Sequence, residues 1–158
     1  MSKRPVHRMG LSVALAALFV GAIAAPVSAG SQTKVTGLLT PDTGNVCIDE
    51  PASLGTYTVS GTLSGCWYII EWNVQNETPS GEFQASGTER FVGWLGSRQG
   101  EFRTSYTYTY KIVGGALVHG RCHHPITGGT GGFATVSGVL QMHDLPNGCS
   151  TYTGQLSF

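Results

Sequence analysis

Four of the five histidines lie in the last third of the sequence. Three of them, His119, His123 and His124, form a cluster with Arg121 and Cys122, whose side chains can also take part in chemistry. Side chains alternate between the two faces of a β-strand, so His119, Arg121 and His123 share one face while Cys122 and His124 take the other. A metal site needs three or four converging ligands, and only two histidines share a face here. The pattern therefore predicts a structural polar cluster and no metal site.

Two glutamates stand on otherwise apolar faces. By the alternation of side chains along a strand, Glu71 shares a face with Trp67, and Glu89 shares a face with Phe83 and Phe91. An ionised carboxylate inside a protein is costly unless it is paired. Each glutamate is therefore either exposed at an edge or an acid inside a cavity that needs a partner. The tyrosines or Arg121 are the partners expected for Glu89.

Residues 102–113 alternate large rings with small polar side chains. Phe102, Tyr106, Tyr108 and Tyr110 fall on one face, which is either core or the wall of a pocket. In an acid/base enzyme a glutamate would carry the proton and phenols or a guanidinium would stabilise negative charge. The predicted ligand-binding residues are Glu89, Glu71, Tyr106, Tyr108 and Arg121.

Other motifs do not extend this set. The sequence lacks a G-x-S-x-G nucleophile elbow, so no catalytic triad is assigned. The glycine-rich stretch TGGTGG at residues 127–132 is followed by neither a helix pattern nor a P-loop lysine, so it is interpreted as a turn. No cofactor is predicted, and whether the chain is an enzyme stays open.

The first residues have the three-part layout of a secretory signal. Lys3, Arg4 and Arg8 precede an uncharged run at residues 11–25, and Pro26 with the small triplet at residues 27–29 follows. The run is shorter than the roughly 20 residues that a membrane span needs. We therefore predict a cleaved signal peptide at residues 1–29, a single domain at residues 30–158, and a secreted, extracellular protein.

The predicted mature chain carries six Lys and Arg against nine Asp and Glu, a net charge of −3. A weakly acidic chain without a basic patch argues against nucleic acid as a partner. No second apolar run of membrane length follows the signal, so no membrane association is expected after cleavage. The oligomeric state is left open.

All four cysteines lie in the predicted mature part. An even number in an exported chain predicts disulfides, and the wide spacing of the cysteines argues against zinc. Of the three possible pairings, Cys47 with Cys66 and Cys122 with Cys149 are favoured, because each pair would join the ends of neighbouring strand segments.

Strand patterns recur about every 12 residues with glycine-rich breaks between them, and no helical period appears after the signal. The domain is predicted to be all-β, as a closed barrel or a sandwich. The expected strands lie near residues 34–40, 56–64, 67–75, 82–94, 100–113, 117–122, 133–142 and 150–158.

Residues 120–138, with the sequence GRCHHPITGGTGGFATVSG, resemble the C-terminal part of bacterial secreted proteins with an allene oxide cyclase-like barrel. The GGTG-x-F turn in this stretch is also similar to that of plant dirigent proteins. The resemblance implies an eight-stranded antiparallel barrel with a cavity, a scaffold that cyclises or steers small apolar molecules. Val136 and Ser137 stand where dirigent proteins carry Ala-Arg, which argues against dirigent-type phenol coupling.

Three functions follow from these patterns. The first is a secreted barrel that binds or steers a small apolar or aromatic molecule. The second is a cofactor-free cyclase or isomerase, and the third is an extracellular structural or interaction module with a filled interior. An open interior lined by aromatic residues and one or two acids favours the first two, whereas a packed interior favours the third.

Overall fold

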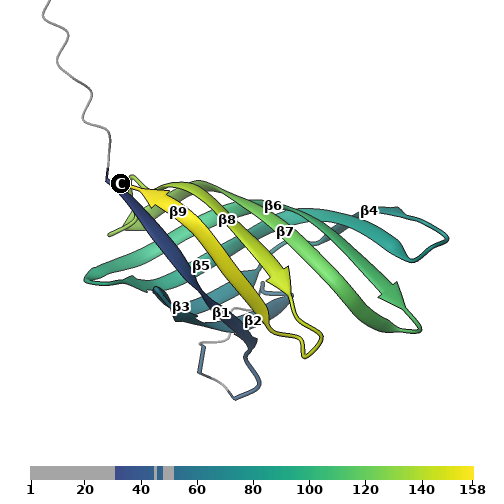
Figure 1. Ribbon diagram of the computed structural model, residues 1–158. Coiled ribbons are helices and arrows are strands. Elements are labelled where there is room, and N and C mark those ends of the chain that lie inside the picture. The colour runs from purple at the N-terminus through teal and green to yellow at the C-terminus, as the bar shows by residue number, and fades with distance from the viewer. Residues whose placement is uncertain (1–30, 45, 48–51) are drawn as a thin grey trace, which may run out of the picture.

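The computed structural model describes residues 31–44, 46–47 and 52–158, and these residues form β-strands and no helix (Figure 1). Neighbouring strands pair antiparallel throughout. The predicted all-β class is confirmed. The strands are β1 (Gln32–Pro41), β2 (Gly55–Gly61), β3 (Leu63–Ile69), β4 (Asn73–Glu77), β5 (Glu82–Leu95), β6 (Arg98–Val113), β7 (Ala116–Gly131), β8 (Ser137–Asp144) and β9 (Ser150–Ser157).

The sheet closes on itself. Its order is β3-β2-β1-β9-β8-β7-β6-β5-β4, and an additional pairing of β3 with β5 completes the ring. Strand β4 pairs with residues 83–86 of β5, and β3 pairs with residues 89–95 of the same strand. The described residues therefore form the predicted eight-stranded antiparallel barrel. The ends of β4 to β7 extend beyond it as an open sheet, at the right of Figure 1.

A β-bulge separates β3 from β4. The backbone N–H groups of Ile70 and Glu71 both donate to the carbonyl oxygen of Thr88, at 2.9 and 3.1 Å. Two residues thus oppose one, which shifts the alternation of side chains along the strand. Gly87 allows this close approach, because a Cβ there would overlap the Glu71 carbonyl oxygen. As a result Trp72 faces the barrel interior and Glu71 is exposed.

Strand β7 is longer than predicted. The sequence places its end near residue 122 and a turn at residues 127–132, whereas the strand continues to Gly131. Proline lacks the N–H that a central strand uses and is tolerated at bulges. Pro125 pairs with Val139 at the end of the β7–β8 ladder, and on its other side it lies where the β6–β7 ladder is interrupted, between the pairs Thr104–Ile126 and Thr107–His123. The expected strand at residues 133–142 begins only at Ser137.

One end of the barrel is filled by four aromatic side chains. Trp67, Phe91, Phe102 and Phe133 are fully buried, with ring centroids 4.8 to 6.2 Å apart. Phe133 comes from the turn between β7 and β8 and closes the barrel at that end. We call these four residues the aromatic plug. The interior is therefore packed at this end.

The cysteines divide into one bridge and two thiols. The predicted Cys47–Cys66 disulfide is confirmed and ties the segment before β2 to β3. Cys122 and Cys149 are free, so the second predicted disulfide is wrong. Cys122 points into the barrel, whereas Cys149 lies half-buried with its Sγ 4.0 Å from the hydroxyl of exposed Thr40. Proximity in sequence does not bring the two thiols to the same side of the sheet.

The two thiols should differ in reactivity. Burial above all, and then the charges of Glu89 and Asp144, raise the pKa of the Cys122 thiol. The thiolate is the nucleophile, so at about pH 8 N-ethylmaleimide should modify Cys149 in the native protein and Cys122 only after unfolding. Mass spectrometry of the peptides, with Cys149→Ser as control, measures this. Absence of modification in the unfolded protein would show that the two cysteines are bridged after all.

The predicted signal peptide, residues 1–29, lies outside the described residues. Its cleavage, the domain limits and secretion therefore stay predictions. Within the described part of the chain, no helix is long and apolar enough to cross a membrane.

Candidate functional site

The half of the barrel away from the aromatic plug holds a cavity of about 230 Å³ that opens to solvent on one side. Five of its wall residues carry large rings, and two carry carboxylates. The rings belong to Tyr57, Trp67, Trp72, Tyr106 and Tyr108, and the carboxylates to Glu89 and Asp144. The barrel interior is thus packed at one end and open at the other.

A buried acid–histidine pair forms part of the cavity wall. Glu89 from β5 reaches across β6 to His124 from β7, with 2.8 Å between Oε2 and Nε2. His124 is 1% exposed and Glu89 7%. The distance is that of an ion pair, although Oε2 receives no aligned hydrogen bond. The partner of Glu89 is therefore His124, and the expected pairing with the tyrosines or Arg121 is wrong.

Further polar atoms near this pair lack hydrogen-bond partners. Trp67 Nε1 and His124 Nδ1 are buried and unpartnered, and both residues line the cavity. Thr104 Oγ1 on β6, between the strands of the pair, is also unpartnered. Buried polar groups are normally hydrogen-bonded, and exceptions cluster at functional sites. The buried surroundings of the Glu89–His124 pair are thus under-satisfied in hydrogen bonds.

Asp144 ends β8 at the other side of the cavity and accepts two hydrogen bonds. The Tyr108 hydroxyl donates to Oδ2, and the Ser150 hydroxyl donates to Oδ1 over 2.6 Å. Burial, followed by the bond to Asp144 and its charge, raises the pKa of the Tyr108 phenol. Tyr108 therefore stays protonated and serves as a donor that fixes the carboxylate in place.

Tyr106 is fixed in a similar way. Its hydroxyl donates to the carbonyl oxygen of Glu71 over 2.8 Å, at the bulge described above. Burial first, and then the charge of Glu89, raise the pKa of Tyr106. The pKa of Tyr57 is raised by burial and then by Asp144 and Glu89. The phenols of the wall are thus neutral near pH 7 and feel the field of the two acids.

A row of rings leads from the open sheet to the cavity. Phe83 stacks on Tyr110 with centroids 4.8 Å apart, and Tyr110 stacks on Tyr108 at 4.7 Å. Trp72 lies 5.6 to 6.1 Å from Tyr106, Tyr108 and Tyr110. Trp72 is 39% exposed, so this ring stands at the mouth of the cavity.

Three of the five residues that the sequence predicts to bind a ligand line the cavity, and the other two do not. Glu89, Tyr106 and Tyr108 line the cavity. Glu71 is exposed because of the bulge, and only its backbone carbonyl contacts the site. Arg121 is exposed on the outer face because Cys122 and His124, of opposite parity, face inward.

Sequence reasoning missed three residues of the site. His124 has the parity of Cys122, and that alternation could have placed it inside the barrel. Asp144 gave no such signal, because its contact with Tyr108 depends on the register of β6, β7 and β8 and its contact with Ser150 on that of the β8–β9 hairpin. Trp72 could not be placed without knowledge of the bulge.

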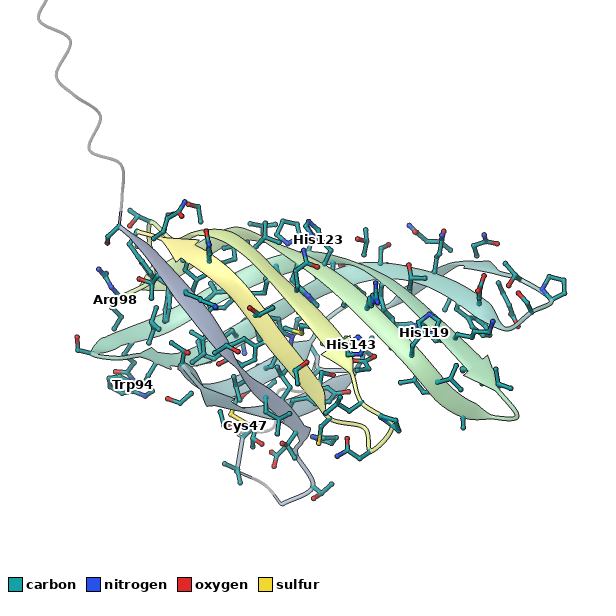
Figure 2. All side chains as sticks on the ribbon, viewed as in Figure 1. Cys47, Trp94, Arg98, His119, His123 and His143 are labelled. Carbon is teal, nitrogen blue, oxygen red and sulfur yellow. A yellow bond between two sulfur atoms is a disulfide. The ribbon has the colours of Figure 1, made fainter. Side chains whose placement is uncertain are left out.

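The other histidines of the described chain lie on the outer face of the sheet. Figure 2 shows His119 and His123 on β7 and His143 on β8, and all three are exposed. His123 contacts the Gln141 amide, with 2.7 Å between Nδ1 and Nε2. Among the residues that the structure describes, no group of three His, Cys, Asp or Glu side chains could hold a metal ion.

Comparisons with known proteins support the fold. No family model matches the chain, and no curated protein matches it in sequence. A solved structure that is similar is a protein of unknown function from the DUF3224 family of Shewanella oneidensis MR-1. The two share 21% identity with a TM-score of 0.54, over 81% of this chain and 98% of that one. This likeness shows the barrel fold alone, and the resemblance to allene oxide cyclases and dirigent proteins stays a prediction.

Proposed function

We propose that the protein is a secreted barrel that binds a small apolar or aromatic molecule in its open half. The observation that carries the proposal is the cavity of about 230 Å³ lined by aromatic rings and two acids. Binding sites for small molecules are concave, mostly apolar and provided with a few polar groups that orient the ligand. Export rests on the signal-like sequence of residues 1–29.

The size of the cavity limits the ligand. An apolar cavity of about 150 Å³ accepts benzene, so this one suits a molecule of about one or two rings. The carboxylates of Glu89 and Asp144 in the wall supply polar groups that can orient such a molecule.

Ligand-observed NMR with a panel of small aromatics tests binding. The probes are indole, benzyl alcohol, benzylammonium and benzoate. At least one should bind saturably, and Met142→Trp, which places a larger ring in the cavity wall, should abolish that binding. The matched control Val92→Trp lies on the outer face and should bind as wild type. Failure of every probe, or binding unchanged in Met142→Trp, would remove the proposal.

A second candidate function is a cofactor-free isomerase or cyclase. The Glu89–His124 pair favours it, because a carboxylate can accept a proton from carbon while an adjacent imidazole returns one. Phenylacetone fits the cavity and carries acidic benzylic hydrogens. Faster exchange of these hydrogens in D₂O with the wild type than with Glu89→Gln, measured by proton NMR, would support it. Equal exchange would leave binding as the function.

A further inference from the structure

We propose that the ligand of this cavity is a small organic ammonium ion that carries an apolar or aromatic body. This inference rests on the proposed function and names the class of molecule that the site takes. Three independent features of the wall support it: its carboxylates, its rings, and the placement of the basic residues elsewhere.

The charges of the wall are negative. Glu89 and Asp144 line the cavity, and His124 is the one lining side chain in the described chain that can carry positive charge. His124 is already opposed by Glu89, so Asp144 is left without a cationic partner. Its hydrogen bonds come from neutral hydroxyls. A bound cation would supply the missing countercharge at low cost, whereas an anion would be repelled.

The basic residues of the described chain lie elsewhere. Lys111 pairs with Glu82 at 3.6 Å, and Arg103 lies 3.9 Å from Glu101. Arg98 stacks over the Phe158 ring, 4.3 Å from its centroid, at the end of the barrel where the plug lies. None of these side chains lines the cavity. The negative field of the interior is therefore not cancelled from within.

The rings at the mouth have the arrangement that attracts cations. The Trp72 and Tyr108 rings have centroids 5.6 Å apart and planes inclined by 65°, so they form two walls of a corner. Ring faces carry negative electrostatic potential, and tryptophan is the strongest partner in cation–π contacts. The Asp144 carboxylate accepts a hydrogen bond from the Tyr108 hydroxyl and therefore lies next to this ring. An ammonium group in this corner would lie beside aromatic rings and near a carboxylate.

The raised pKa values of the tyrosines in the wall agree with a negative electrostatic field in the cavity. Burial is the main cause that raises the pKa values of Tyr57, Tyr106 and Tyr108, and Glu89 or Asp144 contributes to each. Ionised phenols would add negative charge that the neighbouring acids oppose. The same acids would favour positive charge on a molecule that enters.

A charge series on one ring tests the inference in the wild-type protein. Benzylammonium, benzyl alcohol and benzoate have similar size and differ in charge near pH 7. Isothermal titration calorimetry should show benzylammonium binding about tenfold more tightly than benzyl alcohol, and benzoate least tightly. Added salt should weaken the binding of benzylammonium and leave that of the alcohol unchanged.

Two variants locate the charge effect. Asp144→Asn should reduce the affinity for benzylammonium about tenfold while that for benzyl alcohol stays the same. Glu82→Gln removes a carboxylate outside the cavity, where it pairs with Lys111, and should bind both probes as wild type. The charge series in the wild type decides the question even if Asp144→Asn does not fold.

The outcomes separate the two proposals. If none of the three probes nor indole binds, the proposed function fails. If benzyl alcohol or benzoate binds as tightly as benzylammonium, the cavity binds small molecules and the inference about charge is overturned. If both variants weaken benzylammonium equally, the effect comes from overall charge, and the assignment to the cavity is overturned as well.

Discussion

Replacement of His124 by leucine is expected to lower the free energy of unfolding by about 3 to 5 kcal/mol. His124 is 1% exposed and opposes Glu89 at 2.8 Å inside the barrel. Removal of one member of a buried pair leaves the other charge without a partner, and that desolvated charge dominates the loss. Urea unfolding followed by tryptophan fluorescence measures the effect.

The double variant Glu89→Met, His124→Leu is the control for this prediction. Replacement of both members by apolar residues of similar volume removes the buried charge together with its partner. The double variant should therefore be more stable than His124→Leu alone. If the loss of unfolding free energy in the double variant equals the sum of the losses in Glu89→Met and His124→Leu, the two side chains do not interact and the pair has no joint role.

Much of the fold could be predicted because alternation in a strand is a local property. The parity of Phe102, Tyr106 and Tyr108 placed their rings on one face, and the structure puts that face inside the barrel. Glu89 was placed beside Phe91 by the same rule, and both are buried. Each of these residues lies in a strand whose sequence pattern runs without interruption over the residues concerned.

Parity fails where the backbone departs from a regular strand. At Glu71 the bulge against Thr88 adds a residue, so every later side chain of that segment changes face. Pro125 lies within a strand at an interruption of the β6–β7 ladder, between the pairs Thr104–Ile126 and Thr107–His123, where its missing N–H breaks no paired position. Both irregularities depend on pairing with residues far along the chain. The sequence around them carries no local signal.

The site illustrates the same limit at the level of contacts. Glu89 and His124 lie on strands that are separated by β6, and Asp144 at the end of β8 contacts Ser150 at the start of β9 and Tyr108 within β6. Residue types suggested an acid in a cavity, but the choice of partner depends on which strands are neighbours and on their register. The residue types themselves do not give that information.

The division of the barrel into a packed and an open half leads to the second large prediction. Phe102→Ala should lower the free energy of unfolding by about 3 to 5 kcal/mol. Phe102 is fully buried and contacts Trp67, Phe91 and Phe133, with centroids 5.8, 4.8 and 5.4 Å away. Its removal leaves a void among three rings that are held by three separate segments, so the site cannot collapse to refill it.

Phe83→Ala is the matched control, since it removes the same side chain from the open sheet beyond the barrel. Phe83 is half-buried and stacks on Tyr110 alone, so its loss should cost about 1 kcal/mol. Urea unfolding of the two variants under the same conditions gives the comparison. A larger loss from Phe102→Ala would place most of the stability in the plug and leave the open half free to carry an exposed tryptophan. Equal losses from the two variants would show that stability is spread evenly along the barrel, and that the cavity is not supported by a packed end.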